Sequence, residues 1–229
     1  MPLRLAKPVV VRIQKQARRV LNRVPRLENT QFLSVQRPGT ILVDLRAAAS
    51  FVRGFIPGSY NLADLKWLNL LRKNIPLEQR LVYLITEPDT PRDLRRTFAK
   101  HQFEVAGRFH PGVLGEWKTA DGALGVIEEL DPELLAVRLA GWKTVVVDLR
   151  DAAAFQAAHT PEALNLSLDN FRASIAGLPH ETALTVICET GSRSSLAASL
   201  LWNLNYRKLS ILRGGFHRYL ECGLPAIRR

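Results

Sequence analysis

A cysteine, a glycine and an arginine lie within six residues of one another in the C-terminal part of this 229-residue chain. The segment reads Cys188-Glu189-Thr190-Gly191-Ser192-Arg193. A cysteine thiolate is a nucleophile, a glycine lets the main chain fold tightly around the sulfur, and an arginine offers a fixed charge to an anion. The spacing therefore predicts a nucleophilic cysteine that acts on an anionic substrate.

Apolar residues on both sides of this segment indicate how it is held. The run Leu184–Ile187 precedes it, and leucines recur after it at helical spacing, at Leu196, Leu200, Leu201 and Leu204. This order predicts a buried strand, a tight loop and a helix. Unpaired N–H groups and the helix dipole favour negative charge at a helix N-terminus, so we expect Cys188 to lose its proton readily. The alternative is that Cys188 is a small buried apolar side chain.

Four motifs in order resemble the rhodanese (sulfurtransferase) family over roughly residues 130 to 226. They are the strand end Asp148–Arg150, the stretch Phe155–Leu166 (FQAAHTPEALNL), the cysteine loop, and the Gly214-Gly215 pair before an aromatic helix. The resemblance implies a sulfurtransferase in which Cys188 is the nucleophile and the N–H groups of Glu189, Thr190, Gly191, Ser192 and Arg193 hold the transferred sulfur. It implies no metal and no other cofactor.

The N-terminal half repeats the pattern of the C-terminal half. Ile41–Arg46 aligns with Val145–Arg150, and the Asn61-Leu62 pair aligns with Asn165-Leu166, at a constant offset of 104 residues. The strand Leu81–Ile85 aligns with the strand before Cys188 at an offset of 103. A repeat of this length predicts two duplicated domains and excludes a solenoid of short repeats.

The first copy lacks the chemistry of the second. Ile85 stands at the cysteine position, Thr90 stands where Arg193 stands, and Pro88 removes one N–H donor from the loop. We expect this copy to be catalytically silent and to pack against the active copy. Two-domain rhodaneses commonly have their inactive half first, and the chain resembles them in this respect.

The predicted fold class is α/β, with two tandem rhodanese-like domains, each a mostly parallel sheet flanked by helices. Strand C-terminal ends share one edge of such a sheet, which would place Cys188 where sites in open α/β sheets lie. The predicted divisions are a basic arm over residues 1–26, the inactive domain over 27–120, a linker over 121–131 and the catalytic domain over 132–229. Asp131, Pro132 and Glu133 predict the start of a helix.

The composition is that of an ordinary globular protein, with 47% hydrophobic and 23% charged residues. Two cysteines cannot form a disulfide framework, and no apolar run approaches the roughly 20 residues needed to span a bilayer. We therefore expect a cytoplasmic protein. Targeting to an organelle stays open because the N-terminus is rich in arginine and has no acidic residue.

Most of the formal charge of +11 lies in the first 27 residues, which carry eight basic side chains and no acid. Apolar residues at Val9, Ile13, Val20 and Val24 predict a basic amphipathic helix over residues 9 to 24. Such an arm suits an acidic partner, RNA or an anionic membrane surface. The interpretation that we favour is a helix that packs on its own domain with a solvated basic face.

Three further side chains invite a chemical role. Asp148 and Arg150 recur as a pair in the copy without the cysteine, which favours a structural role through buried hydrogen bonds. His159 could be a base for Cys188, and Cys222 could resolve a persulfide as a disulfide. For His159 and Cys222 we also favour structural roles.

The leading hypothesis is transfer of sulfane sulfur from thiosulfate or a persulfide to cyanide or a thiol, through a Cys188 persulfide. A second hypothesis is a non-enzymatic sulfur carrier or a partner-binding scaffold. A third is a cysteine phosphatase of the same fold, but phosphatases place five residues between cysteine and arginine, whereas four intervene here. The shorter loop makes a smaller ring of N–H groups, which is sized for a sulfur atom.

Overall fold

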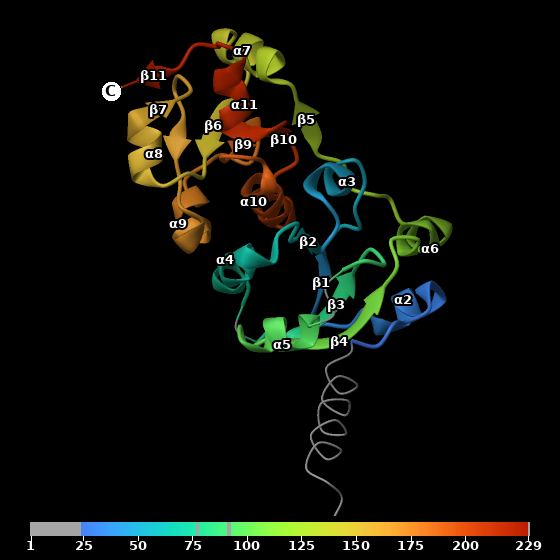
Figure 1. Cartoon of the computed structure of the whole chain (residues 1–229). Helices are drawn as coiled ribbons and strands as arrows, with labels where there is room; N and C mark the ends of the chain where they lie inside the picture. The colour runs from blue at the N-terminus through green and yellow to red at the C-terminus, as the bar shows by residue number, and fades with distance from the viewer. Residues whose placement is uncertain (1–23, 77, 91–92, 229) are drawn as a thin grey trace, which may run out of the picture.

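The computed structural model describes residues 24–76, 78–90 and 93–228. Two sheets with flanking helices lie one above the other, the N-terminal half below and the C-terminal half above in Figure 1. The predicted basic helix over residues 9 to 24 falls outside the described residues except for Val24. No helix in the described part of the chain is both long enough and apolar enough to cross a membrane.

The first half contains one parallel sheet in the order β2-β1-β3-β4. Its elements are η1 (Asn29–Gln31), α2 (Phe32–Val35), β1 (Thr40–Asp44), α3 (Ala48–Val52), β2 (Ser59–Asn61), η2 (Leu65–Trp67), α4 (Leu68–Asn74), β3 (Leu81–Ile85), α5 (Leu94–Ala99), β4 (Glu104–Phe109) and α6 (Val113–Thr119). The strands alternate with helices along the chain, as predicted, because each parallel crossover needs a connecting segment.

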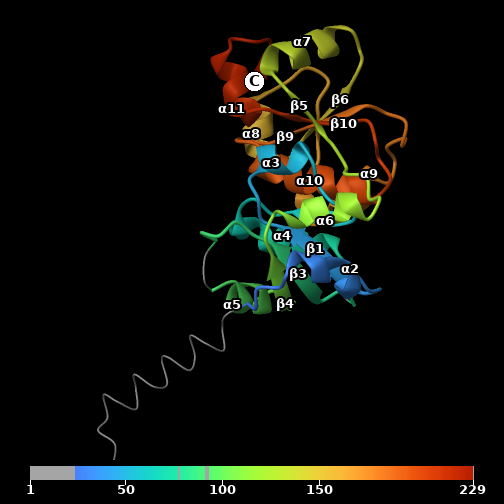
Figure 2. The same ribbon diagram turned by 90° about the vertical axis from the view of Figure 1, so that its right-hand side faces the viewer.

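The second half contains a parallel sheet in the order β8-β6-β9-β10-β5. Its elements are β5 (Glu128–Leu130), α7 (Pro132–Ala140), β6 (Val145–Asp148), α8 (Ala152–Ala157), β7 (Ala158–His159), β8 (Leu164–Asn165), η3 (Leu168–Asn170), α9 (Phe171–Ile175), β9 (Leu184–Ile187), α10 (Ser192–Asn203), β10 (Leu209–Leu212), α11 (Gly215–Glu221) and β11 (Ile227–Arg228). Strands β7 and β11 form a separate antiparallel pair. Figure 2 shows the two sheets from the side.

The boundary between the halves differs in one respect from the sequence prediction. Part of the segment expected to be a linker forms β5, which is an edge strand of the second sheet. The same segment also touches the first half, where Gly125 exchanges main-chain hydrogen bonds with Phe55. The helix predicted at Asp131 is present as α7, but the Asp131 side chain pairs with Arg213 rather than capping the helix.

The four shared strands of the two sheets have the same order, and their strand ends carry the same hydrogen bonds. Asp44 binds Arg46 as Asp148 binds Arg150, through both carboxylate oxygens. Asn61 donates from its side chain to the Asp44 and Arg46 carbonyls, and Asn165 does the same to Asp148 and Arg150. The Asp–Arg pairs are buried, as the sequence predicted.

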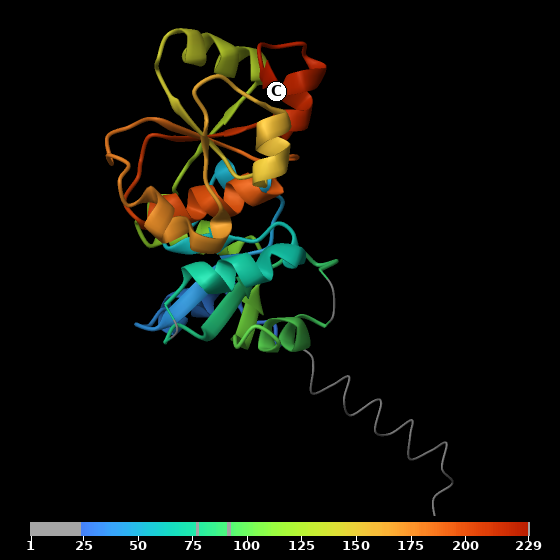
Figure 3. The ribbon, with the colours of Figure 1, turned by 90° about the vertical axis from the view of Figure 1, so that its left-hand side faces the viewer.

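Helix α10 lies between the two halves (Figures 1 and 3). It packs on β9 and β10 of its own sheet and on β2 and α3 of the first half. Its buried leucines belong to a hydrophobic cluster that also includes residues of the first half, among them Val43, Phe55 and Leu62. The helix that follows the cysteine loop is therefore held by both halves of the chain.

Candidate functional site

The loop that carries Cys188 connects strand β9 to the N-terminus of α10. Gly191 precedes the helix with a φ of +100°, a left-handed conformation that glycine adopts without the Cβ penalty of other residues. This turn directs the Gly191 N–H at the sulfur, and the distance from N to Sγ is 3.1 Å. Cys188 is buried, with 1% of its surface exposed. The strand, loop and helix are those predicted from the sequence.

The sulfur has fewer main-chain donors than the sequence suggested. The prediction was a ring of N–H groups from Glu189 to Arg193; among the described residues, the Gly191 N–H is the main-chain group that donates to Sγ. The side chains of Glu189 and Thr190 point outward and are exposed, whereas Gly191 is buried.

The N-terminal part of α11 fixes the other side of the loop. The Phe216 N–H donates to the Cys188 carbonyl at 2.8 Å, and the His217 N–H donates to the Glu189 carbonyl at 3.2 Å. The ring of Phe216 in turn lies 3.7 Å from the guanidinium carbon of Arg150. The main chain at Cys188 and Glu189 is therefore held by α11, which begins about thirty residues later in the sequence.

Arg193 is held at the end of the neighbouring strand. Its Nη1 donates to the Leu149 carbonyl at 3.0 Å, and the Leu149 N–H donates to the Ile187 carbonyl, immediately before Cys188. The Ala154 N–H donates to Asp151 and lowers the pKa of that carboxyl, and the nearby charge of Arg193 lowers it further. Arg193, the arginine predicted to bind an anion, thus lies at the edge of the sheet where β6 and β9 end and where Cys188 follows β9.

Glu189, the first residue after the cysteine, lies near a second arginine. Its Oε2 is 3.9 Å from Nη1 of Arg150, whose other nitrogens already bind Asp148 and the Ala158 carbonyl. The Glu189 side chain is about half exposed, at 52%. The cysteine segment therefore carries one carboxylate and one guanidinium, which lie near the consecutive residues Arg150 and Leu149.

Trp67 of the first half is the part of the site that sequence reasoning missed. Its Nε1 donates to the Ser192 hydroxyl at 3.1 Å, and the guanidinium carbon of Arg193 lies 5.0 Å from the centre of its ring. Trp67 stands 121 residues before Cys188 in the sequence, and no motif marks it. Only the packing of η2 against α10 places it at the loop.

The other two side chains considered from the sequence are bound elsewhere. His159 Nδ1 makes a hydrogen bond with the Phe155 carbonyl, and its ring stacks on that of Phe155 at 4.0 Å. Cys222 is a free thiol at the end of α11, and burial, together with a hydrogen bond to Glu133, raises its pKa. The contacts of His159 with Phe155 and of Cys222 with Glu133 hold these side chains within the fold.

At the equivalent position of the first half, Ile85 is fully buried and Thr90 makes a hydrogen bond with the Glu87 carbonyl. A small cavity of about 30 Å³ remains there, bordered by residues that include Arg26, Thr86 and Arg108. Two arginines thus lie near the strand end of this half, but a nucleophile is missing from it.

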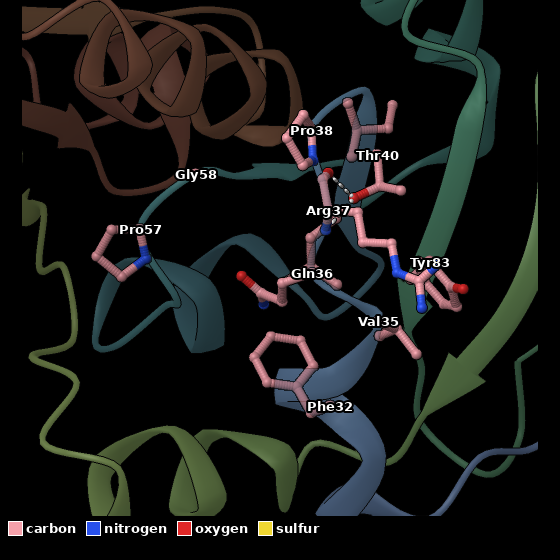
Figure 4. Close-up of a pocket in the computed structure, with 11 residues that line it drawn as sticks. Phe32, Val35, Gln36, Arg37, Pro38, Thr40, Pro57, Gly58 and Tyr83 are labelled. Carbon is pink, nitrogen blue, oxygen red and sulfur yellow. Dashed lines mark hydrogen bonds between the residues drawn. The ribbon is translucent and has the colours of Figure 1, made fainter.

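A larger cavity of about 340 Å³ lies elsewhere in the first half, between α2 and strands β1 and β3. Phe32, Arg37, Pro57 and Tyr83 are among its walls (Figure 4), and Thr40 Oγ1 donates to the Arg37 carbonyl at its rim. None of its lining residues belongs to the cysteine loop. Within the described residues, no group of three or more His, Cys, Asp or Glu side chains could hold a metal ion.

Comparisons with known proteins match one family. The family model for the rhodanese-like domain matches residues 131–222. A sulfurtransferase of Allochromatium vinosum is 30% identical over 103 residues, which are 44% of this chain and 96% of that protein. The thiosulfate sulfurtransferase GlpE of Tolumonas auensis is 32% identical over 71 residues, which are 31% of this chain and 67% of that protein.

Two solved structures also align with the chain. The rhodanese-like domain of the Anabaena protein Alr3790 has a TM-score of 0.41 and 22% identity, over 44% of this chain and 79% of that one. A thiosulfate sulfurtransferase of Pseudomonas aeruginosa has a TM-score of 0.38 and 17% identity, over 90% of this chain and 44% of that one.

Proposed function

Because this chain belongs to the rhodanese-like domain family, we propose that its C-terminal half is a sulfurtransferase that carries sulfane sulfur on Cys188. The observation that carries the proposal is the hydrogen bond from the Gly191 N–H to Cys188 Sγ, together with the Arg193 guanidinium held at the end of the neighbouring strand. A main-chain N–H that points at the sulfur stabilises the thiolate, because its partial positive charge is already oriented toward the anion.

The proposed reaction has two displacements at sulfur. The Cys188 thiolate attacks the outer sulfur of the donor; a new S–S bond forms, the old S–S bond breaks, and the leaving group departs with the electron pair. With thiosulfate the leaving group is sulfite. An acceptor thiolate or cyanide then attacks the outer sulfur of the persulfide and releases the Cys188 thiolate, so the enzyme is neither oxidised nor reduced over the cycle.

Burial of the cysteine limits the donors that fit this scheme. With 1% of Cys188 exposed, we expect only a terminal sulfur atom at the tip of a donor to reach it. The carboxylate of Glu189 in the loop disfavours a small dianion such as thiosulfate, so a persulfide, whose sulfur end carries at most one charge, is the donor that we expect to react faster.

We also propose that the first half is a silent copy of the same domain that supports the second. The shared strand order and the matched Asp–Arg and Asn hydrogen bonds support this proposal. Ile85 in place of a cysteine leaves that copy without a nucleophile. Every turnover of the chain should then depend on Cys188.

The test compares the wild-type protein with Cys188→Ser and with Cys222→Ser as a matched control. Purified protein is given thiosulfate or a glutathione persulfide with cyanide, and thiocyanate is measured. We expect the wild type and Cys222→Ser to form thiocyanate and to gain about 32 Da, the mass of one sulfur atom, after incubation with the donor alone. Turnover in Cys188→Ser, or a sulfur adduct on another residue, would overturn the proposal.

A further inference from the structure

We infer that Trp67, although it belongs to the first half, is a positioning residue that holds Arg193 toward the anionic group of the substrate. The inference rests on the function proposed above and adds a residue to its site. Trp67 contacts two consecutive residues of the loop: it donates to the Ser192 hydroxyl, and its ring lies 5.0 Å from the Arg193 guanidinium carbon. No motif of the C-terminal half supplies either contact.

Arg193 is fixed on two sides by these contacts. The Leu149 carbonyl takes one Nη1 hydrogen, and the indole face attracts the guanidinium. The guanidinium has five N–H donors in a planar fork, so donors are left for an anion after Leu149 is satisfied. Asp151 and Lys66 are the charged groups nearby, Asp151 beside Arg193 and Lys66 at 4.9 Å from the centre of the indole ring.

Trp67 is itself held by the way α10 packs on the first half. Three contacts follow the same helix toward its C-terminal end: Ser199 Oγ accepts from the Asn61 N–H, Asn203 donates to the Ser59 carbonyl, and the rings of Trp202 and Phe55 meet edge to face. They repeat at helical spacing, so one face of α10 is bound to the first half from Ser192 to Asn203. Trp67 contacts this face at Ser192, the first residue of α10, next to the cysteine loop.

The inference is tested on the thiol alone, with no sulfur donor present. Alkylation of Cys188 by iodoacetate, which is anionic, is compared with alkylation by iodoacetamide, which is neutral, and peptide mass mapping separates Cys188 from Cys222. The ratio of the two rates reports the positive charge at the sulfur and cancels differences in access to the buried thiol. The variants are Trp67→Ala, Trp67→Phe, Ser192→Ala and Arg193→Gln, each in the full-length protein.

We expect Arg193→Gln to lower the ratio and Trp67→Ala to lower it by about threefold or more, since the indole face no longer holds the guanidinium. Trp67→Phe keeps an aromatic face and should keep most of the ratio, and Ser192→Ala removes one hydrogen bond and should leave it within about twofold. The double variant Trp67→Ala with Arg193→Gln should match Arg193→Gln alone, because Trp67 acts through the arginine.

An unchanged ratio in Trp67→Ala, or an equal fall in Trp67→Phe, would overturn the inference. If Trp67→Ala does not fold, Trp67→Leu keeps the bulk of the side chain without an aromatic face and gives the same comparison. Thiocyanate formation with an unchanged ratio would overturn the role of Trp67 and leave the proposed function standing. If no thiocyanate forms but the ratio depends on Trp67, the proposed function is overturned and the role of Trp67 stands.

Discussion

A Cβ atom added to Gly215 would lie 2.5 Å from the carbonyl oxygen of Cys188 and 2.4 Å from that of Glu189. Glycine permits this approach, and it also permits the φ of +68° that Gly215 adopts. The contact lets the next residue, Phe216, donate its N–H to the Cys188 carbonyl. The start of α11 and the cysteine loop are thereby packed main chain to main chain.

Gly215→Ala should destabilise the protein by about 2 kcal/mol or more, because a Cβ at this position meets two carbonyl oxygens in a left-handed conformation. Urea unfolding measures the change. Gly115→Ala is the matched control: Gly115 lies in α6, nothing lies within 4 Å of its added Cβ, and the substitution should stabilise by about 0.5–1 kcal/mol. Equal stability of Gly215→Ala and wild type would contradict the described packing.

Two serines of α10 should respond in opposite ways to replacement by alanine. Ser199 Oγ accepts from the Asn61 N–H, so Ser199→Ala leaves a buried donor unpaired and should cost about 1–3 kcal/mol. Ser194 Oγ is buried and has no partner among the described residues, so Ser194→Ala should be neutral or stabilising. Urea unfolding of both variants measures the change in the free energy of unfolding. A larger loss of stability in Ser194→Ala than in Ser199→Ala would contradict the hydrogen bonding described for these two serines.

Asp148→Asn should destabilise by about 3–5 kcal/mol, because it leaves the Arg150 charge buried without its partner. The side chains of Asp148 and Arg150 are 0% and 5% exposed, and the Asp148 carboxylate accepts three hydrogen bonds from the Arg150 side chain and one from its main-chain N–H. Asp151→Asn is the control, since Asp151 is an exposed helix cap and asparagine caps a helix equally well. Thermal unfolding with a change of less than about 0.5 kcal/mol in Asp148→Asn would show that the pair is dispensable.

Cys222 should react slowly with neutral thiol reagents at neutral pH. Burial raises the pKa of this thiol, and so does the carboxylate of Glu133 that accepts its hydrogen bond. The thiolate fraction therefore lies below that of an ordinary cysteine and grows only at higher pH. The iodoacetamide rate at Cys222, followed by peptide mapping from pH 7 to 10, should rise through a midpoint above the ordinary value of about 8.5.

Glu133→Ala removes both the acceptor and its charge and should move the midpoint for Cys222 downward. Glu181→Ala provides a control, because Glu181 pairs with Lys208 and is not among the groups that shift the pKa of Cys222. A Cys222 that reacts as fast as a free thiol at pH 7 in the wild type would refute this environment.

Residue patterns at fixed spacing predicted the local elements. The apolar run before Cys188 and the leucines after it specified β9 and α10. The offset of 104 residues paired Asp44 with Asp148, and these two residues make matching hydrogen bonds in the structure. These features are local or repeated in the chain, so they can be recognised from the sequence alone. Strand β5 was missed because three residues at a sheet edge carry no period of their own.

The sequence by itself determined which residue is the nucleophile candidate, which half lacks one, and which charged residues neighbour it in the chain, because these depend on residue type and position. Only the tertiary structure decided how many main-chain donors reach the sulfur, how deeply it is buried, and that Trp67 meets Ser192 and Arg193. The physical reason is that these properties arise where α10 packs between two sheets. Contacts across that interface join residues more than a hundred positions apart, and no local pattern encodes them.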